Sequence, residues 1–265
     1  MSKSFVQVLI RVVLMGLLML FGSCAAKKIL VKNADNLLEH QIEKRLPLYS
    51  KQKEELSSDI TAFLNETRPK AHELLPVIDG LDLEKSDKLE SQYRQIATLY
   101  EDISLNFTRL LAKHMAVLDQ KQQKEFFENL ADENRQLAKK EPDDRLKKNK
   151  ERFKKFFGAI DDGQKQMLTE LQDKIEAGRE AKLERRANLI KKLKEIYAEE
   201  SSVKARQAEI TSTFKDYQKN AHDHSKNLGI LKTILATISP EQKEFFRKQV
   251  AEVKEILKLY LETEY

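Results

Sequence analysis

Residues 118–127 read LDQKQQKEFF, and residues 238–246 read ISPEQKEFF. In the first stretch an apolar residue is followed by Asp119, and Gln122 stands three positions further on. This spacing is typical of a capping box: the first side chain accepts a hydrogen bond from an N–H in the opening turn of a helix, while the glutamine binds back to the N–H of the cap residue. The stretch therefore predicts a sharp corner between two helices.

The same spacing occurs at two further places. In residues 238–246, Ser239 takes the cap position and Gln242 the third position of the helix, with a proline between them that suits the first helical position. Residues 160–164, IDDGQ, place Asp161 and Gln164 in the same way. The sequence thus predicts three helix corners of one kind, distributed along most of the chain.

The composition favours helices over strands. The chain has 265 residues with seven glycines, five prolines, no tryptophan and 34% charged residues, and its mean hydropathy is −0.60. The 48 basic and 43 acidic side chains nearly balance, which is typical of solvated helix faces with ion pairs one turn apart. A nucleic-acid-binding protein would show a one-sided basic excess, so we expect no nucleic-acid partner.

Apolar residues recur at threes and fours through long stretches, which indicates amphipathic helices. The expected segments are 27–45, 50–77, 83–117, 119–139, 145–157, 161–199, 203–235 and a last helix from residue 239. We expect Pro69 and Pro76 to kink or end the second segment. The predicted fold is an all-α, elongated bundle of about seven long helices. It forms one domain over residues 24–265, or two that meet near Gly158.

The N-terminal residues resemble the signal segment of a bacterial lipoprotein. Lys3 and Arg11 precede an uncharged apolar run, residues 12–21, which is short for a permanent membrane anchor. The chain's single cysteine, Cys24, follows Gly22 and Ser23, as in a lipobox. We expect residues 1–23 to be removed and Cys24 to be acylated, which attaches the protein to a membrane. An uncleaved anchor or an ordinary cleaved signal remains the alternative.

The corners and the lipobox together resemble two groups of envelope proteins. The corner pattern is similar to the LTxxQ signature of Spy-type periplasmic chaperones, small cradles of long helices. More of the chain resembles a family of uncharacterised bacterial lipoproteins with corners at places that correspond here to residues 48–52, 118–135, 160–164 and 238–242, the first having Tyr49 at the cap position. The resemblance implies a helical envelope protein that binds another protein or acts as a chaperone. Ala25, with no aspartate directly after Cys24, indicates transfer to the outer membrane, facing the periplasm.

Catalytic chemistry has no support in the sequence. It lacks a glycine-rich phosphate loop, a G-x-S-x-G nucleophile turn and the E-x-x-H spacing of helical di-iron sites. His222 and His224 diverge on a helix and so predict no metal site. We expect a non-enzymatic protein without a cofactor.

Two basic runs are candidate binding surfaces. They read RLKKNKERFKK at residues 145–155, with Lys147 and Lys148, and KLERRANLIKKLK at 182–194, with Lys191 and Lys192. Each can lie on anionic lipid or receive an acidic protein, or it can be a solvated face whose lysines pair with neighbouring acids.

A polar stretch that includes Asn134 and Arg135 is a third candidate surface. It can line a groove between helices or face water at a helix end. Two functions remain open from the sequence: a protein-binding envelope module, and a structural lipoprotein whose basic helices rest on lipid.

Overall fold

The computed structural model describes residues 24–81, 86–139, 142–176, 178–221 and 224–265. These residues contain 11 α-helices and no strand, which confirms the all-α prediction. The predicted signal segment, residues 1–23, lies outside the described residues. The helices are α2 Cys24–Lys32, α3 Ala34–Glu43, α4 Ser50–Asp79, α5 Ser86–Ala116, α6 Gln120–Ala138, α7 Pro142–Phe157, α8 Asp162–Glu176, α9 Arg179–Ala198, α10 Val203–Ala221, α11 His224–Leu235 and α12 Pro240–Glu262.

Three expected segments are each divided into two helices, so the estimate of seven helices was too low. The leader forms α2 and α3, residues 161–199 form α8 and α9, and residues 203–235 form α10 and α11. Gly178 lies at the start of α9, where it takes the N-cap position. A glycine costs only about 1 kcal/mol inside a helix, so the packing of the flanking helices decides whether the helix continues.

The two prolines do not end α4, which continues through Pro69 and Pro76 to Asp79. Both prolines lie on the exposed side of the helix. A proline leaves the carbonyl four residues earlier without a helical donor, and on this side of the helix water can replace that donor. On the opposite side, the Tyr260 hydroxyl of α12 donates to the Leu64 carbonyl and binds α4 to the end of the chain.

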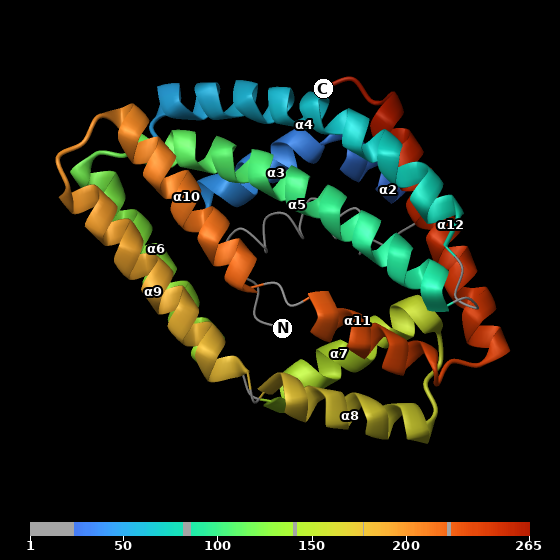
Figure 1. Cartoon of the computed structure of the whole chain (residues 1–265). Coiled ribbons are helices and arrows are strands. Elements are labelled where there is room, and N and C mark those ends of the chain that lie inside the picture. Colours follow the sequence, from blue (N-terminus) through green and yellow to red (C-terminus); the bar gives the residue numbers. More distant parts are fainter. Residues whose placement is uncertain (1–23, 82–85, 140–141, 177, 222–223) are drawn as a thin grey trace.

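The helices are arranged as a frame in Figure 1. The α4 and α5 helices form its upper side, α6 and α9 its left side, and α7, α8 and α11 its lower side, while α12 runs along the right side from the lower corner to α4. Contacts between α12 and each of α2, α4 and α7 show that this helix spans the height of the frame.

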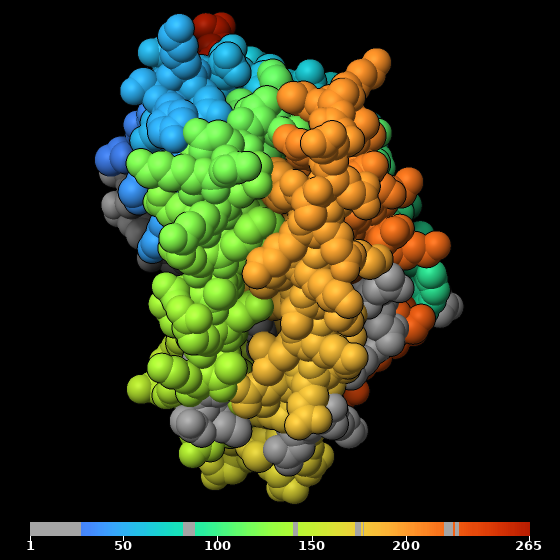
Figure 2. Space-filling view, turned by 90° about the vertical axis from the view of Figure 1, so that its left-hand side faces the viewer, coloured from blue at the N-terminus to red at the C-terminus, as the bar shows by residue number. Residues whose placement is uncertain are grey.

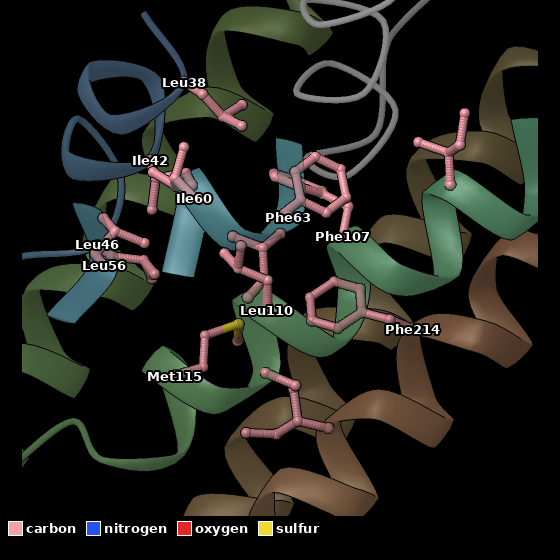
Figure 3. Packing of buried hydrophobic residues seen from close by; sticks show 14 of the residues in the cluster. Leu38, Ile42, Leu46, Leu56, Ile60, Phe63, Phe107, Leu110, Met115 and Phe214 are labelled. Carbon is pink, nitrogen blue, oxygen red and sulfur yellow. The ribbon is translucent and has the colours of Figure 1, made fainter. Parts of the chain in front are cut away.

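Most buried side chains belong to one large core between α2–α6, α9, α10 and the end of α12. Figure 3 shows its centre. The rings of Phe63 of α4 and Phe107 of α5 pack there with their centroids 5.4 Å apart and their planes tilted by 60°, near Phe214 of α10. A smaller cluster lies at the lower side of the frame, around Phe153, Phe157, Leu168 and Ile238. The two halves of α12 belong to different clusters, and this helix therefore joins the clusters to each other.

Candidate functional site

The first corner pair is formed by the start of α4 and the start of α6. The Gln122 side chain accepts a hydrogen bond from the Asp119 N–H at 3.1 Å, and Asp119 accepts one from the Gln122 N–H at 2.8 Å, which completes the capping box. Gln52 accepts from the N–H of Tyr49 at 2.9 Å in the same manner. The residues that were expected only to cap their own helices also lie beside each other.

The two glutamines of this corner pair bind one another. The Gln122 amide donates to Gln52 Oε1 at 2.6 Å and to the Pro47 carbonyl at 2.6 Å, while the Gln52 amide donates to Gln122 Oε1 at 3.4 Å. Gln122 is 2% exposed. Its donors and acceptors are thus used inside the protein, and the bonds to Gln52 join segments 70 residues apart. We call Gln52 and Gln122 the first glutamine pair.

The second glutamine pair, Gln164 and Gln242, repeats this geometry at the other end of the frame. Gln164 donates to Gln242 Oε1 at 2.7 Å and to the Thr237 carbonyl at 2.9 Å. Gln242 donates to Gln164 Oε1 at 3.0 Å and to the Ala159 carbonyl at 2.6 Å. Both glutamines also accept from their cap residues, Asp161 at 3.2 Å and Ser239 at 2.9 Å. The four corners therefore hold the structure together, and their polar atoms are occupied by one another.

One aromatic side chain links the caps of the first corner pair. The Tyr49 hydroxyl donates to Asp119 Oδ2 at 2.9 Å. The backbone N–H of Gln122 and the Tyr49 hydroxyl together lower the pKa of Asp119, and the hydrogen bond to Asp119 raises the pKa of Tyr49. The carboxylate is thus fixed as an acceptor, which is the role of a cap.

The polar stretch of α6 is divided between packing and solvent. Asn134 accepts from Arg186 of α9 at 2.5 Å, and Glu133 accepts from Arg45 at 2.7 Å and lies 3.5 Å from Arg186. Arg186 is only 3% exposed, so this network joins α6 to α9 in the interior. Arg135 instead points to solvent and pairs with Asp132 on its own helix. Of the two alternatives for this stretch, Asn134 lies between helices and Arg135 faces water.

Arg186 is a residue that the sequence analysis missed. It lies on the same face of α9 as the buried Leu189, Leu193 and Ile196. The sequence could have indicated a buried arginine here, because Arg186 has the same helical spacing as the apolar residues of this face. A buried arginine needs a hydrogen-bonding partner in the interior. The Arg186 partners Asn134 and Glu133 lie on α6, 52 and 53 residues earlier in the chain, so the local signal does not identify them.

The basic runs occupy different parts of the frame. Lys147 and Lys148 are exposed on α7, and neither forms an ion pair with another described residue. Lys191 and Lys192 are exposed on α9, where Lys191 lies 3.9 Å from Glu195. The two lysine pairs lie on different helices, α7 and α9.

Lys191 and Lys192 line a groove between α9 and α10, which we call the α9–α10 groove. Its volume is about 360 Å³. Leu189 and Tyr217, each 8% exposed, contribute its apolar part. The charged and polar lining residues are Arg185, Asn188, Lys191, Lys192, Glu195, Thr213 and Asp216. It is a mixed surface on which cationic and anionic side chains lie beside an apolar part.

Arg185 gives the α9–α10 groove an unmet hydrogen-bonding requirement. Its Nε atom is buried and makes no hydrogen bond within the described part of the chain. An unsatisfied buried donor costs about 1–3 kcal/mol. A carboxylate or carbonyl oxygen that reached this atom would remove that cost.

A buried histidine forms a separate polar cluster with a carboxylate and a lysine, away from the groove. His114 of α5 is 1% exposed, with Nε2 lying 2.8 Å from Asp59 Oδ2. Lys113 binds the same carboxylate at 2.6 Å. Burial lowers the pKa of His114 below its ordinary value, although Asp59 opposes that shift. This cluster lies between α4 and α5, where it contributes to packing.

The described residues contain no group of three or more histidine, cysteine, aspartate or glutamate side chains that could hold a metal ion. Among the same residues no helix combines the length and the apolar content required to cross a membrane. Cys24 begins α2.

No protein-family model, curated protein or solved structure matches this chain.

Proposed function

We propose that this chain is a lipid-anchored bacterial envelope protein without enzymatic activity, and that its folded part binds another protein. The anchoring is supported by the lipobox-like sequence that ends at Cys24, and by the absence of any other cysteine in the chain. The expected attachment is to the outer membrane, on the side that faces the periplasm. Several acyl chains on one residue would make the attachment effectively permanent.

The observation that carries the protein-binding proposal is the α9–α10 groove. Its apolar residues, Leu189 and Tyr217, provide area for an apolar side chain. The cationic lining residues Arg185, Lys191 and Lys192 outnumber the acidic Glu195 and Asp216, which favours an oxygen acceptor or a negative charge nearby. A polypeptide segment with an acidic residue next to an apolar one provides both, so we propose that class of partner. The resemblance to Spy-type chaperones supports a client that is partly unfolded.

Photocrosslinking in cells tests this proposal. A photoreactive residue in place of Asn188, an exposed residue of the groove, should give a reproducible protein adduct. The same residue in place of Lys148 on α7 is the control and should not give that adduct. Replacing Lys191 and Lys192 by glutamine should weaken the adduct, whereas replacing Lys147 and Lys148 should not.

A client assay complements the crosslinking. The protein should suppress aggregation of an unfolding client at near-stoichiometric amounts. Part of the effect should persist in high salt, since apolar contact is not screened. If no adduct forms at position 188 above the control and client aggregation is unchanged, the protein-binding proposal is wrong.

A second candidate function is supported by α7. Its exposed lysines, including Lys147 and Lys148, form no ion pair with other described residues, as expected of a surface that rests on anionic lipid. Replacing both lysines by glutamine should then reduce binding to anionic vesicles, with a strong salt dependence. The matched replacement of Lys191 and Lys192 should leave vesicle binding unchanged.

A further inference from the structure

The outward face of α2 and α3 combines exposed aliphatic and basic side chains directly after Cys24. Ile29 is 62% exposed and Leu37 is 42% exposed. Lys28 and Lys32 are exposed on either side of Ile29 in the sequence. We call the exposed set Lys28, Ile29, Lys32, Asn33, Asn36 and Leu37 the tether-side stripe.

The backbone makes this stripe one continuous surface. The Asn33 N–H donates to the Ile29 carbonyl at 3.1 Å, and the Leu37 N–H donates to the Asn33 carbonyl at 3.0 Å. These bonds continue the helical pattern across the junction between α2 and α3. The Asn33 side chain also donates to the Ile29 carbonyl at 2.6 Å. The stripe therefore follows the side of a nearly uninterrupted helix.

The opposite face of α2 and α3 is buried in the large core, which keeps the stripe on the outside of the protein. Val31, Leu38 and Ile42 are each at most 1% exposed and belong to the large core. The Tyr265 hydroxyl donates to the Val31 carbonyl at 2.9 Å, which holds α2 to the end of the chain. Because this face is packed against α4 and α12, the helices cannot rotate to bury Ile29 and Leu37.

The charges of the stripe favour contact with an anionic surface. None of the six stripe residues is acidic and no acidic residue occurs between Cys24 and Asp35, while the partly exposed Asp35 and Glu39 lie beside the α3 half of the stripe. Neither Lys28 nor Lys32 forms an ion pair with another described residue. Further along, Glu43 is neutralised by Lys53 at 3.1 Å. Lysines beside an exposed aliphatic residue fit an anionic bilayer, where ammonium groups bind headgroup phosphates and aliphatic groups enter the acyl boundary.

We infer that the tether-side stripe lies on the anionic phospholipid surface of the membrane to which the chain is anchored. This inference rests on the proposed anchoring at Cys24. Ile29 follows Cys24 by five residues, about 8 Å along the helix, so the anchor would keep the stripe close to the headgroups. Lipidation supplies the attachment, and the stripe sets the orientation of the frame on the bilayer.

This orientation leaves the α9–α10 groove available. In Figure 2 the blue α3 region lies at the left edge, whereas α9 and α10, in orange, occupy the right half. A frame that rested on its tether-side stripe would thus keep the groove on a different part of its surface. Lipid binding and protein binding would not compete.

Fluorescence labelling of the full-length protein, reconstituted in vesicles, tests the inference. Ile29→Cys and Leu37→Cys variants carry a polarity-sensitive dye at the stripe. The control carries the dye at Val203, a 49% exposed residue that begins α10, and a dye at Lys148 on α7 reports on the competing lipid-facing surface. In phosphatidylglycerol-containing vesicles the stripe dyes should shift to shorter wavelength and be quenched by brominated lipid, and the dye at Val203 should not. Phosphatidylcholine vesicles should give a smaller effect.

Charge removal makes the test sharper. Adding Lys28→Gln and Lys32→Gln should reduce the ratio of membrane-bound to water-exposed stripe by about fivefold per lysine, since each lysine near an anionic surface contributes about 1 kcal/mol. Stripe dyes that report water in every vesicle would overturn the inference, as would a shift at Lys148 without one at Ile29. A concentration-dependent shift without vesicles would mean that a second copy covers the stripe, which also contradicts it. The mass of the mature N-terminus reports separately on acylation of Cys24, so failure of the anchor is distinguishable from failure of the stripe.

Discussion

At the scale of single residues, side chains at the corners satisfy backbone N–H groups at the starts of helices. Ser239 accepts from the Gln242 N–H at 3.2 Å and donates to Glu241 at 2.7 Å. The bond from Ser239 lowers the pKa of Glu241, which keeps this carboxylate charged at the start of α12. A negative charge there is favourable, because the N-terminus of a helix carries a partial positive charge. The capping residues were predictable from sequence because their bonds are local.

Ser239→Ala should lower the free energy of unfolding by about 1 kcal/mol, because the N–H of Gln242 loses its acceptor. Ser239→Asp, which keeps an acceptor as at the other two corners, should stay within about 0.5 kcal/mol of the unsubstituted protein. Urea unfolding followed by circular dichroism measures both. Equal stability of the alanine and aspartate variants would show that this cap contributes nothing.

Stability should fall at acidic pH in part through His114. Burial lowers its pKa in the folded state, so the unfolded chain binds the proton more readily. The contribution of neutral His114 is complete above pH 6.5, the ordinary value, and is lost as the pH falls below it. The neighbouring groups Asp59, Lys113 and Glu55 modify the shift but burial is its largest cause.

His114→Gln should therefore reduce the loss in thermal midpoint between pH 7.5 and pH 5. His72→Gln, at an exposed position of α4, is the matched control and should leave this loss unchanged. An undiminished pH dependence in the His114 variant would refute the assignment.

At the scale of elements, local signals predicted where helices begin better than where they are interrupted. The starts of α6 and α12 follow from Asp119 and Ser239. The break at Gly178 does not follow from a local signal, because apolar residues stay in phase on both sides of it. Leu168 of α8 belongs to the small cluster and Leu193 of α9 to the large core. The two cores, which no local pattern encodes, require the chain to turn between these helices.

Two glycines should respond to alanine with opposite signs. Gly158, which ends α7, has a φ of +79°, a conformation that costs an alanine about 1–2 kcal/mol. Gly229 lies inside α11 with no atom within 4 Å of an added Cβ, so alanine should stabilise the helix by about 1 kcal/mol there. Chemical unfolding of Gly158→Ala and Gly229→Ala measures both values. A stabilising effect at Gly158 would contradict the described turn.

At the scale of the whole molecule, long-range pairing holds the frame together and was not predictable. The sequence identified Gln122, Gln164 and Gln242 as cap residues, and residues 48–52 as a weaker copy. It did not show that the corners meet in pairs, because the bonds join segments 70 and 78 residues apart. The lysines of the α9–α10 groove were likewise identified without their groove, which requires α10 to pack beside α9.

The central claim is that the glutamine pairs hold separate parts of the chain together, and a double-mutant cycle tests it most directly. Gln52→Ala, Gln122→Ala and the double variant are compared by their free energies of unfolding, with Gln120→Ala, an exposed position in the same turn, as the control. Because each single substitution removes the hydrogen bonds between the two glutamines, the two effects should be coupled by about 1–3 kcal/mol, and Gln120→Ala should be nearly neutral. The same coupling is expected for Gln164 and Gln242. Additive effects at both pairs would contradict the claim.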